Sequence, residues 1–501
     1  MSDKRWLRSY DPDVPPSLTY PQGDLWGHLA GRAQGFGPRP ALRFMGLSLS
    51  YDQLFASAEK MAAGLAARGV RQDDRVVLLM PNCPQFVIAF LALMRLGATA
   101  VMANPLNVER ELLFKFHDSG AKGLIALDLL SQKVNNIRTE LDLDFTVFTS
   151  LADYLPFPKS LLYPLVRRFD KKMPKVEIAW DAKTYRFKDL LKENNPAPGT
   201  GEIDPEAVAA LIYSGGTTGV SKGIMLSHRA CLANLTQVTA WVGVQEDDAL
   251  LAVLPLFHGF GMSVCMNSPL AAGGAIVLLP RFEAKMTVEA IERERPTLFA
   301  GVPTMFIALK EEPGIEKRNL KSLRGIFVGA APLPLAVMRD FEEMTGASLI
   351  EGYGLTEAVT AVACNPYQGV RKPGTIGIPF PDVEWKIVDL ADGARELPPG
   401  EAGEIVLKGP DLMSGYWNQP DLSADTIRDG WLFTGDIGVM DEDGYVTLVD
   451  RKKDLVIVSG FNVFPSEIDE VLHGHPKVAE AVAVGLPHPT KGEYLKAFVV
   501  P

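Results

Sequence analysis

Residues 208–223, with the sequence VAALIYSGGTTGVSKG, join an apolar run to a loop of glycines, hydroxyl residues and one lysine. The short apolar run Val208–Tyr213 is typical of a buried strand. Glycines let backbone amides approach phosphate oxygens, hydroxyl groups add hydrogen-bond donors, and Lys222 adds a positive charge. The stretch therefore predicts a phosphate-binding loop that follows a buried strand.

This loop differs from the Walker type of nucleotide-binding loop. Ser221 rather than glycine precedes Lys222, and valine follows Gly219. A glycine-rich turn by itself is more often structural, but the density of donors after a buried strand favours phosphate binding. The candidate residues of the loop are Ser214, Gly215, Gly216, Thr217, Thr218, Gly219 and Lys222.

Up to about Pro366, the chain alternates apolar runs with helical patterns. The predicted strands include Val76–Met80, Gly123–Ala126, Ala275–Leu279 and Gly325–Val328, and the predicted helices include Gln85–Leu96 and Leu335–Met344. This alternation is typical of parallel sheets covered by helices on both faces. After Pro366, short segments between Gly, Pro and Asp turns predict the hairpins of a smaller β subdomain.

The length of 501 residues allows several domains. We predict an α/β fold with a large N-terminal domain over residues 1–450, made of parallel-sheet α/β subdomains and a β-rich subdomain at about 370–450. A small α+β C-terminal domain is expected over residues 451–501. The 61 acidic and 50 basic residues give a formal charge of −11, which argues against nucleic acid as a partner.

The cysteines and the N-terminus predict a cytoplasmic protein. The four cysteines have neither metal-ligand spacing nor the pattern of a disulfide framework, and the first residues lack the apolar core of a secretory signal. The uncharged stretch 249–280 is interrupted by Pro255 and Pro269, so we interpret it as buried strands and loops rather than a membrane span. A homodimer is left open.

Residues 159–188 have the opposite charge from the rest of the chain. They hold nine Lys or Arg residues against three acidic ones, a local charge of +6, and apolar side chains lie between them. Such a segment is either a peripheral contact with the inner face of an anionic membrane or a solvated surface insertion.

A second motif, EGYGLTE at residues 351–357, follows the strand-like run Ser348–Ile350. An aromatic ring between glycines can lie against a purine, a threonine hydroxyl can meet a phosphate, and a lone carboxylate can hold Mg²⁺. The alternative is a turn with an exposed glutamate. The candidates here are Gly352, Tyr353, Gly354, Thr356 and Glu357, with the turn Gly329, Ala330, Ala331 and Pro332 as the opposite wall of a base pocket. Asp436, expected at the end of a strand, is a candidate partner for ribose hydroxyls.

Six motifs in order, YSGGTTGVSKG, PLFHGFG, EGYGLTEA, GYW, GWLFTGD and DRKKDLVIVSGFNVFP, resemble the adenylate-forming superfamily of acyl-CoA synthetases, luciferases and peptide-synthetase adenylation domains. The resemblance covers essentially the whole chain. The last motif and the basic insertion most resemble bacterial long-chain fatty-acyl-CoA ligases, and HGFGM resembles beetle luciferases. The resemblance implies that ATP and a carboxylic acid form an acyl-AMP and pyrophosphate, and that CoA then displaces AMP.

The resemblance also implies residue roles. Thr217, Thr218 and Lys222 would hold pyrophosphate, Thr356 and Glu357 the α-phosphate, and Thr217 and Glu357 the Mg²⁺. Tyr353 and the turn Gly329–Pro332 match the adenine site, and Asp436 and Arg451 match the ribose contacts. Lys453 matches the hinge of the C-terminal domain, and Gly460 would face the pantetheine channel. His258 matches a histidine near the substrate carboxylate, with a buried structural histidine as the alternative.

An alkyl chain needs a dry lining, so Phe257, Phe260 and Met262 are the candidates for an acyl pocket. Three other functions stay open: a ligase for aryl or medium-chain acids, a non-catalytic acyl- or nucleotide-binding remnant, and transfer to a carrier protein in place of CoA.

One expected feature is missing from the sequence. Family members carry, near the end of the C-terminal domain, a lysine in a GK-type motif that reaches the carboxylate and α-phosphate during adenylation. Neither Lys491-Gly492 nor Lys496 matches this motif, and few residues follow Lys453. We therefore expect a truncated C-terminal domain and severely impaired adenylation if the 501 residues are the whole molecule.

Overall fold

The computed structural model describes residues 4–169, 173–193, 195–199, 201–214, 221–458, 461–475, 477–488 and 492–501. The chain separates into two compact units. The large unit comprises Ser17–Val362 and Pro410–Leu422, and the small unit comprises Met1–Pro16, Ala363–Gly409 and Ser423–Pro501. The boundary predicted at residue 450 falls inside the small unit and stays a prediction.

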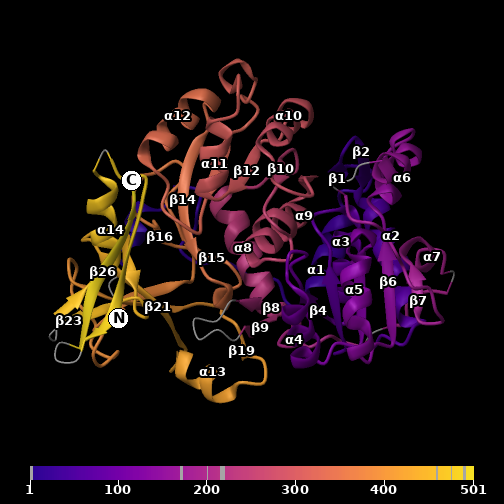
Figure 1. Ribbon diagram of the computed structural model, residues 1–501, viewed down its shortest axis with the longest axis horizontal. Helices are drawn as coiled ribbons and strands as arrows, with labels where there is room; N and C mark the ends of the chain where they lie inside the picture. Colours follow the sequence, from indigo (N-terminus) through magenta and orange to yellow (C-terminus); the bar gives the residue numbers. More distant parts are fainter. Residues whose placement is uncertain are drawn as a thin grey trace. The chain divides into compact units, whose positions relative to one another are not determined.

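The first sheet of the large unit has the strand order β19-β9-β8-β4-β3-β5-β6-β7. Strands β8, β9 and β19 lie next to one another in Figure 1. Its strands are β3 (Arg75–Leu79), β4 (Thr99–Met102), β5 (Gly123–Leu127), β6 (Phe145–Thr149), β7 (Thr184–Arg186), β8 (Val208–Ser214), β9 (Lys222–Ser227) and β19 (Gly415–Tyr416). Strands β3 to β8 pair in parallel, whereas β9 pairs antiparallel with both β8 and β19. The predicted buried strands at 76–80, 123–126 and 208–213 are confirmed.

The second sheet of the large unit continues through the order β14-β13-β12-β10-β11-β1-β2. Its strands are β1 (Pro40–Phe44), β2 (Leu47–Ser50), β10 (Ala249–Ala252), β11 (Ala275–Leu278), β12 (Leu298–Gly301), β13 (Gly325–Val328) and β14 (Ser348–Gly354). Strands β10 to β14 pair in parallel, and so do β1 and β11, as the alternation of strands and helices predicts.

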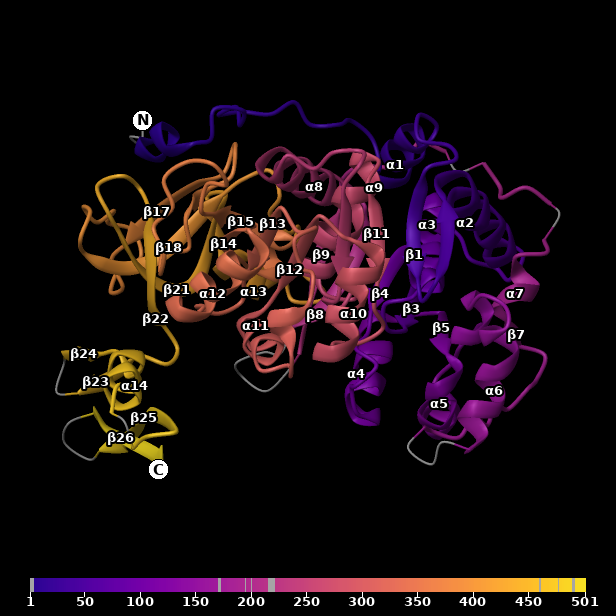
Figure 2. The ribbon, with the colours of Figure 1, turned by 90° about the horizontal axis from the view of Figure 1, so that it is seen from above.

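Helices cover these sheets. They are α1 (Leu25–Ala33), α2 (Tyr51–Ala66), α3 (Pro84–Leu96), α4 (Glu109–Ser119), α5 (Ser131–Ile137), α6 (Lys159–Phe169), α7 (Phe187–Leu190), α8 (His228–Val242), α9 (Ser268–Ala272), α10 (Ala284–Glu294), α11 (Pro303–Lys310) and α12 (Leu335–Thr345). Helices α2 and α3 lie side by side (Figure 2). Pro84 lies in the first turn of α3, where the missing N–H costs nothing, and Gly97 ends the helix in the left-handed conformation. Residues of α10, α11 and α12 share one buried core with β10 to β14.

The interpretation of 249–280 as strands and loops is wrong in its middle part. Between β10 and β11 the chain forms a π-helical segment, Gly261–Asn267, that continues into α9. Every residue of both segments is buried, so no polar face marks a helical period in the sequence. Pro269 lies in the first turn of α9, where a proline is tolerated. Within the described residues, no helix is long and apolar enough to span a bilayer.

The small unit holds an antiparallel sheet with the order β17-β18-β21-β20, and β22 pairs with β21. Its strands are β17 (Glu384–Val388), β18 (Ala402–Lys408), β20 (Ile427–Arg428), β21 (Trp431–Met440) and β22 (Val446–Arg451). The predicted hairpin of β17 and β18 is confirmed. The N-terminal segment joins this unit through the buried Trp6 and through Asp11, whose carboxylate accepts from the backbone amides of 367–369.

A second sheet in the small unit has the order β24-β23-β26-β25, with α14 (Pro465–His473) packed against β25. Its strands are β23 (Val456–Val458), β24 (Phe461–Val463), β25 (Glu480–His488) and β26 (Gly492–Val500). The first turn of α14 is tied to β22, because the amide and hydroxyl of Ser466 donate to the carboxylate of Asp450 at 3.1 and 2.8 Å.

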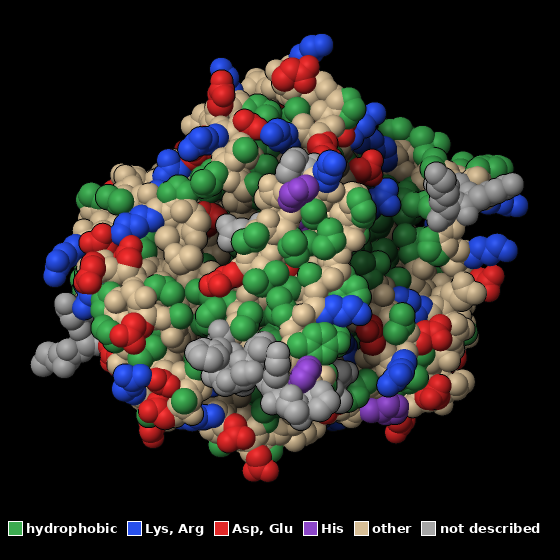
Figure 3. All heavy atoms as spheres, turned by 60° about the vertical axis from the view of Figure 1, so that its left-hand side comes forward, with side chains coloured by type: hydrophobic (Ala, Val, Ile, Leu, Met, Phe, Trp, Pro, Cys, Tyr) green, Lys and Arg blue, Asp and Glu red, His purple; other side chains and the backbone are tan. Residues whose placement is uncertain are grey.

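Charges of both signs are interspersed on the face shown in Figure 3. Among the described side chains on that face, no continuous basic surface is present.

Candidate functional site

The base of the predicted phosphate loop is a β hairpin. Ser214 at the end of β8 pairs with Lys222 at the start of β9, and the hydroxyl of Ser221 donates to the carbonyl of Ser214 at 2.8 Å. Gly215, Gly216, Thr217, Thr218 and Gly219 lie outside the described residues. The ammonium of Lys222 lies 5.2 Å from the ring centroid of Tyr416 and forms no ion pair with any residue in the described ranges.

Glu357 is held in place by the segment Pro410–Trp417. The hydroxyl of Tyr416 donates to Oε1 of Glu357 at 2.8 Å, and the amide of Met413 donates to the backbone carbonyl of Glu357 at 2.7 Å. Within the part of the chain that the structure describes, Oε2 of Glu357 has no hydrogen-bond partner. Tyr416 thus connects the two charged candidates, Lys222 and Glu357. The GYW motif marks Tyr416 in the sequence, but its letters alone give no role for it.

The chain reverses sharply directly after Glu357. Val359 has φ 59° and ψ −60°, and the amide of Thr360 donates to the carbonyl of Ala358 at 2.6 Å, which together form a γ-turn. A positive φ is unusual for a β-branched residue, and such strain gathers at functional sites. Only glycine fits at position 354, because a Cβ there would lie 1.7 Å from the carbonyl oxygen of Thr360.

The HGFG segment packs against this turn. A Cβ on Gly259 would lie 2.1 Å from the carbonyl oxygen of Val359, so the two segments touch through their backbones. The ring of Phe260 lies 3.2 Å from the Cβ position of Gly329. The candidates for the acyl pocket and for the base pocket are therefore neighbours. Met262 is buried, and Phe257 and Phe260 are partly buried.

His258 is neutral and oriented as a donor. Nδ1 of its ring accepts from the amide of Phe260 at 3.2 Å, so the proton of the neutral ring is on Nε2. Burial among protein atoms lowers the pKa of His258, although its side chain stays open to solvent. The imidazole of His258 can therefore present Nε2–H to a ligand. The alternative, a buried structural histidine, does not fit a side chain that is open to solvent.

The candidate base pocket is less open than expected. Tyr353 is only 7% exposed, so a base would contact it through the small part of its surface that is open. Gly329 is buried, whereas Ala330, Ala331 and Pro332 are exposed, and Ala330 has a positive φ of 72°. The alternative, a turn with an exposed glutamate, is met in part: Glu357 lies in the short 3-10 turn Thr356–Ala358, but it is half-buried. Glu351 of the same motif is buried on β14, and the motif lies on this strand as far as Gly354.

The remaining candidates belong to the small unit. Asp436 lies in the middle of β21, not at the end of a strand, so the sequence-based expectation is wrong on this point. A positive φ of 73° at Gly435 and a register shift after Ile437 make the strand irregular there, which gave the segment its turn-like composition. Nε of Arg451 lies 3.5 Å from Oδ1 of Asp436. Lys453 is exposed in a turn after β22, and Gly460 lies outside the described residues.

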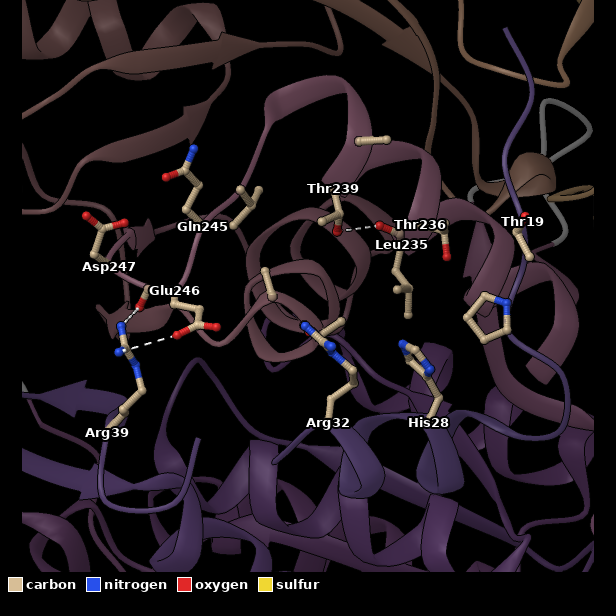
Figure 4. Close-up of a pocket in the computed structure, with 15 residues that line it drawn as sticks. Thr19, His28, Arg32, Arg39, Leu235, Thr236, Thr239, Gln245, Glu246 and Asp247 are labelled. Atoms are coloured by element: carbon tan, nitrogen blue, oxygen red, sulfur yellow. Dashed lines mark hydrogen bonds and ion pairs between the residues drawn. The ribbon is translucent and has the colours of Figure 1, made fainter. Parts of the chain in front are cut away.

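A cavity of about 820 Å³ lies elsewhere in the large unit, between α1 and α8 (Figure 4). His28 and Arg32 point into it from α1, and Leu235, Thr236 and Thr239 line it from α8. Arg39 pairs with Glu246 at one end. None of the residues predicted for the site lines this cavity.

In the large unit, Lys222 opens the antiparallel strand β9, and Glu357 and the neutral His258 lie in the segments that follow the parallel strands β14 and β10. Segments after the ends of parallel strands are where α/β folds commonly bind ligands. A family model for AMP-binding enzymes matches residues 29–417, and the model for the AMP-binding enzyme C-terminal domain matches residues 467–501. The chain belongs to the AMP-binding enzyme family, which confirms the resemblance found in the sequence.

Curated relatives agree over almost the whole chain. A long-chain-fatty-acid--CoA ligase of Bacillus subtilis (strain 168) is 40% identical over 505 residues, covering 100% of this chain and 89% of the relative. A protein of the same name from Escherichia coli O6:H1 is 36% identical, covering 99% of this chain and 89% of the relative.

Solved structures agree with the fold. ATP-bound MatB from Rhodopseudomonas palustris is similar with a TM-score of 0.82 and 30% identity, covering 95% of this chain and 88% of that one. The o-succinylbenzoate CoA synthetase of Bacillus subtilis in complex with its acyl-adenylate is similar with a TM-score of 0.77 and 29% identity, covering 96% of this chain and 89% of that one.

Proposed function

We propose that the chain is an AMP-forming long-chain fatty-acid:CoA ligase. A carboxylate oxygen of the fatty acid attacks the α-phosphorus of ATP, and pyrophosphate leaves. The sulfur of CoA then attacks the acyl carbon, and AMP leaves with the electron pair of the broken C–O bond. The observation that carries the proposal is the 40% identity, over the full chain, to a protein named as such a ligase.

The large unit supplies the charges for the first step. Lys222 neutralises charge on the departing pyrophosphate, Thr217 and Thr218 donate hydrogen bonds to it, and Thr356 donates to the α-phosphate. Glu357 and Thr217 are the proposed holders of Mg²⁺, and the unpaired Oε2 of Glu357 fits a cation that prefers carboxylate oxygen. When bound, Mg²⁺ would neutralise charge on the phosphates during transfer.

His258 orients the acid. Its ring is neutral, so Nε2–H donates a hydrogen bond to one oxygen of the fatty-acid carboxylate and leaves the other oxygen to attack. No general base is required, because the carboxylate is already ionised at neutral pH. Phe257, Phe260 and Met262 line the start of the acyl pocket, and each buried CH₂ of the chain adds roughly 0.8 kcal/mol.

The other substrates are assigned to the remaining candidates. Tyr353, the glycines at 352 and 354 and the turn Gly329–Pro332 form the proposed adenine site. In the small unit, Asp436 and Arg451 contact the ribose. Lys453 is the proposed hinge for the second step, in which Gly460 faces the pantetheine of CoA.

Helix α6 is the proposed contact with a membrane surface. Leu161, Leu162, Leu165, Val166 and Phe169 are each between 50% and 79% exposed. Arg167 anchors the helix to the protein through Asp128 at 2.8 Å, and Lys159 and Arg168 flank the apolar face. This composition suits an amphipathic helix lying on anionic lipid.

Vesicles that contain an anionic lipid test the membrane contact. Leu161→Ser with Phe169→Ser should lower co-sedimentation several-fold, because both side chains would otherwise enter the lipid. Val471→Ser, which removes an equally exposed apolar side chain from α14, should leave co-sedimentation unchanged. Equal binding by both variants would contradict a role of α6.

A panel of acids tests the ligase activity. AMP release from ATP and CoA should be fastest with C12 to C18 fatty acids. Preference for aromatic or shorter acids would point to the alternative ligases, and pyrophosphate exchange without thioester formation would point to another acceptor. Absence of both reactions, with ATP still bound, would favour a non-catalytic binding protein.

A further inference from the structure

One buried tyrosine contacts both charged residues that are proposed to act on the triphosphate. Tyr416 is 6% exposed and lies on β19, where it pairs with Ile224 of β9, two residues after Lys222. Its hydroxyl donates to Oε1 of Glu357 at 2.8 Å, and its ring centroid lies 5.2 Å from Nζ of Lys222. Both distances fall within the usual limits for a hydrogen bond and a cation–π contact.

The hydrogen bond restricts the carboxylate of Glu357. A hydrogen bond to an ionised group is stronger than one between neutral groups, so Oε1 is held toward Tyr416. The rotation of the carboxylate is then limited, and Oε2 points in one direction. Lys222 and Glu357 form no ion pair with each other in the described structure, although Lys222 lies over the ring of Tyr416 and Glu357 accepts from its hydroxyl. Because the two charges do not pair with each other, both Lys222 and Glu357 can bind a ligand.

The backbone around Tyr416 is fixed to the same two elements. The amide of Trp417 donates to the carbonyl of Gly223 at 2.7 Å, next to Lys222, and the amide of Met413 donates to the carbonyl of Glu357. Asp411 anchors the start of the segment in the core, where its carboxyl accepts from Nδ2 of Asn234 at 3.2 Å. Tyr416 therefore cannot shift without moving β9 or Glu357.

We propose that Tyr416 is a positioning residue that presents the carboxylate of Glu357 to the divalent cation of the metal–ATP complex. The inference rests on the proposed function, because it takes Glu357 as the metal-binding carboxylate. In this proposal Tyr416 acts on the metal through Glu357. Its effect is a gain in ATP affinity that depends on the metal.

The test is the affinity of the full chain for ATP, measured by calorimetry in saturating Mg²⁺ and again in EDTA. The ratio of the dissociation constant in EDTA to the dissociation constant in Mg²⁺ gives the factor by which the metal strengthens ATP binding. Tyr416→Phe keeps the ring and removes the hydroxyl, and it should lower this ratio about tenfold, the usual effect of losing a hydrogen bond to a charged group. A ratio equal to that of the wild type would overturn the proposal, even if both affinities fell.

Tyr445 provides a matched control. Its ring contacts Nζ of Lys372 at 4.4 Å, as the ring of Tyr416 contacts that of Lys222 at 5.2 Å, but its hydroxyl donates to the neutral backbone carbonyl of Val370 at 2.5 Å rather than to a carboxylate. Tyr445→Phe should leave the ratio unchanged. A drop as large as that of Tyr416→Phe would show a general loss of stability and overturn the proposal.

A double-mutant cycle with Glu357→Gln locates the effect. Glu357→Gln alone should lose most of the metal-dependent gain in ATP affinity. Adding Tyr416→Phe to this variant should then change the gain no further. A further loss would show that Tyr416 acts through another group. If the wild type itself binds ATP equally in Mg²⁺ and EDTA, the metal role of Glu357 and this inference both fail. If only the Tyr416 variant matches the wild type, this inference alone fails.

Discussion

In the large unit, Glu357 is held through both its side chain and its backbone, whereas in the small unit Arg451 reaches Asp436 through an ion pair of 3.5 Å. The side chain of Arg451 is 63% exposed, and Tyr416, which holds Glu357, is 6% exposed. The difference has a physical consequence. The carboxylate of Glu357, which is proposed to act on the phosphates through Mg²⁺, is fixed before the substrate arrives, while the proposed ribose and hinge residues keep the freedom to move.

The largest expected effect on the free energy of unfolding comes from replacing one glycine by alanine in each of the two units. Gly354→Ala in the large unit places a Cβ 1.7 Å from a backbone oxygen and should cost more than about 3 kcal/mol in the free energy of unfolding. Gly435→Ala in the small unit meets nothing within 4 Å and should cost about 1 kcal/mol, from its positive φ alone. Urea unfolding measures the loss in free energy of unfolding for each variant. Equal losses would contradict the tighter packing of the large unit at this site.

A second effect, of similar size, concerns the buried anchor of the segment Pro410–Trp417. Asp411 is fully buried, and its Oδ1 has no hydrogen-bond partner among the described residues. Burial raises the pKa of Asp411 from 3.8 to about 7, although Asn234 and Arg229 act in the opposite direction. The folded protein therefore keeps a proton that the unfolded chain loses. The stability from this proton is present below about pH 4 and disappears as the pH rises to about 7.

Asp411→Asn should remove this pH dependence. Relative to the wild type, its free energy of unfolding should rise between pH 4 and pH 8 by as much as about 4 kcal/mol, at roughly 1.4 kcal/mol per pKa unit. Asp248→Asn is the control of opposite sign. Burial by itself raises the pKa of Asp248, but hydrogen bonds from Arg324 and Thr297 bring it below its usual value, so this variant should lose stability near pH 8. If urea unfolding shows that both variants gain, or both lose, stability between pH 4 and pH 8, the claim that burial raises the pKa of Asp411 is wrong.

The smallest effect is expected for Arg451→Gln. An ion pair with one exposed partner contributes little, so the variant should lower the free energy of unfolding by less than about 1 kcal/mol. A loss above about 2 kcal/mol in urea would show that the small unit is restrained as firmly as the large one.

Much of the fold follows from local patterns. The predicted strand Gly325–Val328 is observed with the same bounds, and the predicted helix Gln85–Leu96 is α3 with Pro84 added. Apolar runs bounded by turn residues identify buried strands, because a parallel sheet covered on both faces excludes polar side chains. The same uniform burial hid the helical segment between Gly261 and Ala272, where no polar side chain marks the period.

The candidate site was predictable where the chain marks it with rare chemistry. Lys222, Glu357 and His258 stand out as single charged or titratable residues in glycine-rich surroundings. Tyr416 does not, because its role depends on contacts with residues 59 and more positions away in the chain. The sequence placed Asp436 at the end of a strand, whereas it lies in the middle of β21. The strand has the composition of a turn there, because Gly435 has a positive φ.

By itself, the sequence determined the family, the alternation of strands and helices, and the set of charges that the proposed reaction needs. These properties are local, because they depend on the order and type of neighbouring residues. Only the tertiary structure decided which groups are held and which are free: the tautomer of His258, the pairing of Glu357 with Tyr416, and the burial of Asp411. Each depends on hydrogen bonds and desolvation between segments that are distant in sequence, and these energies arise only when the folded chain brings the segments together.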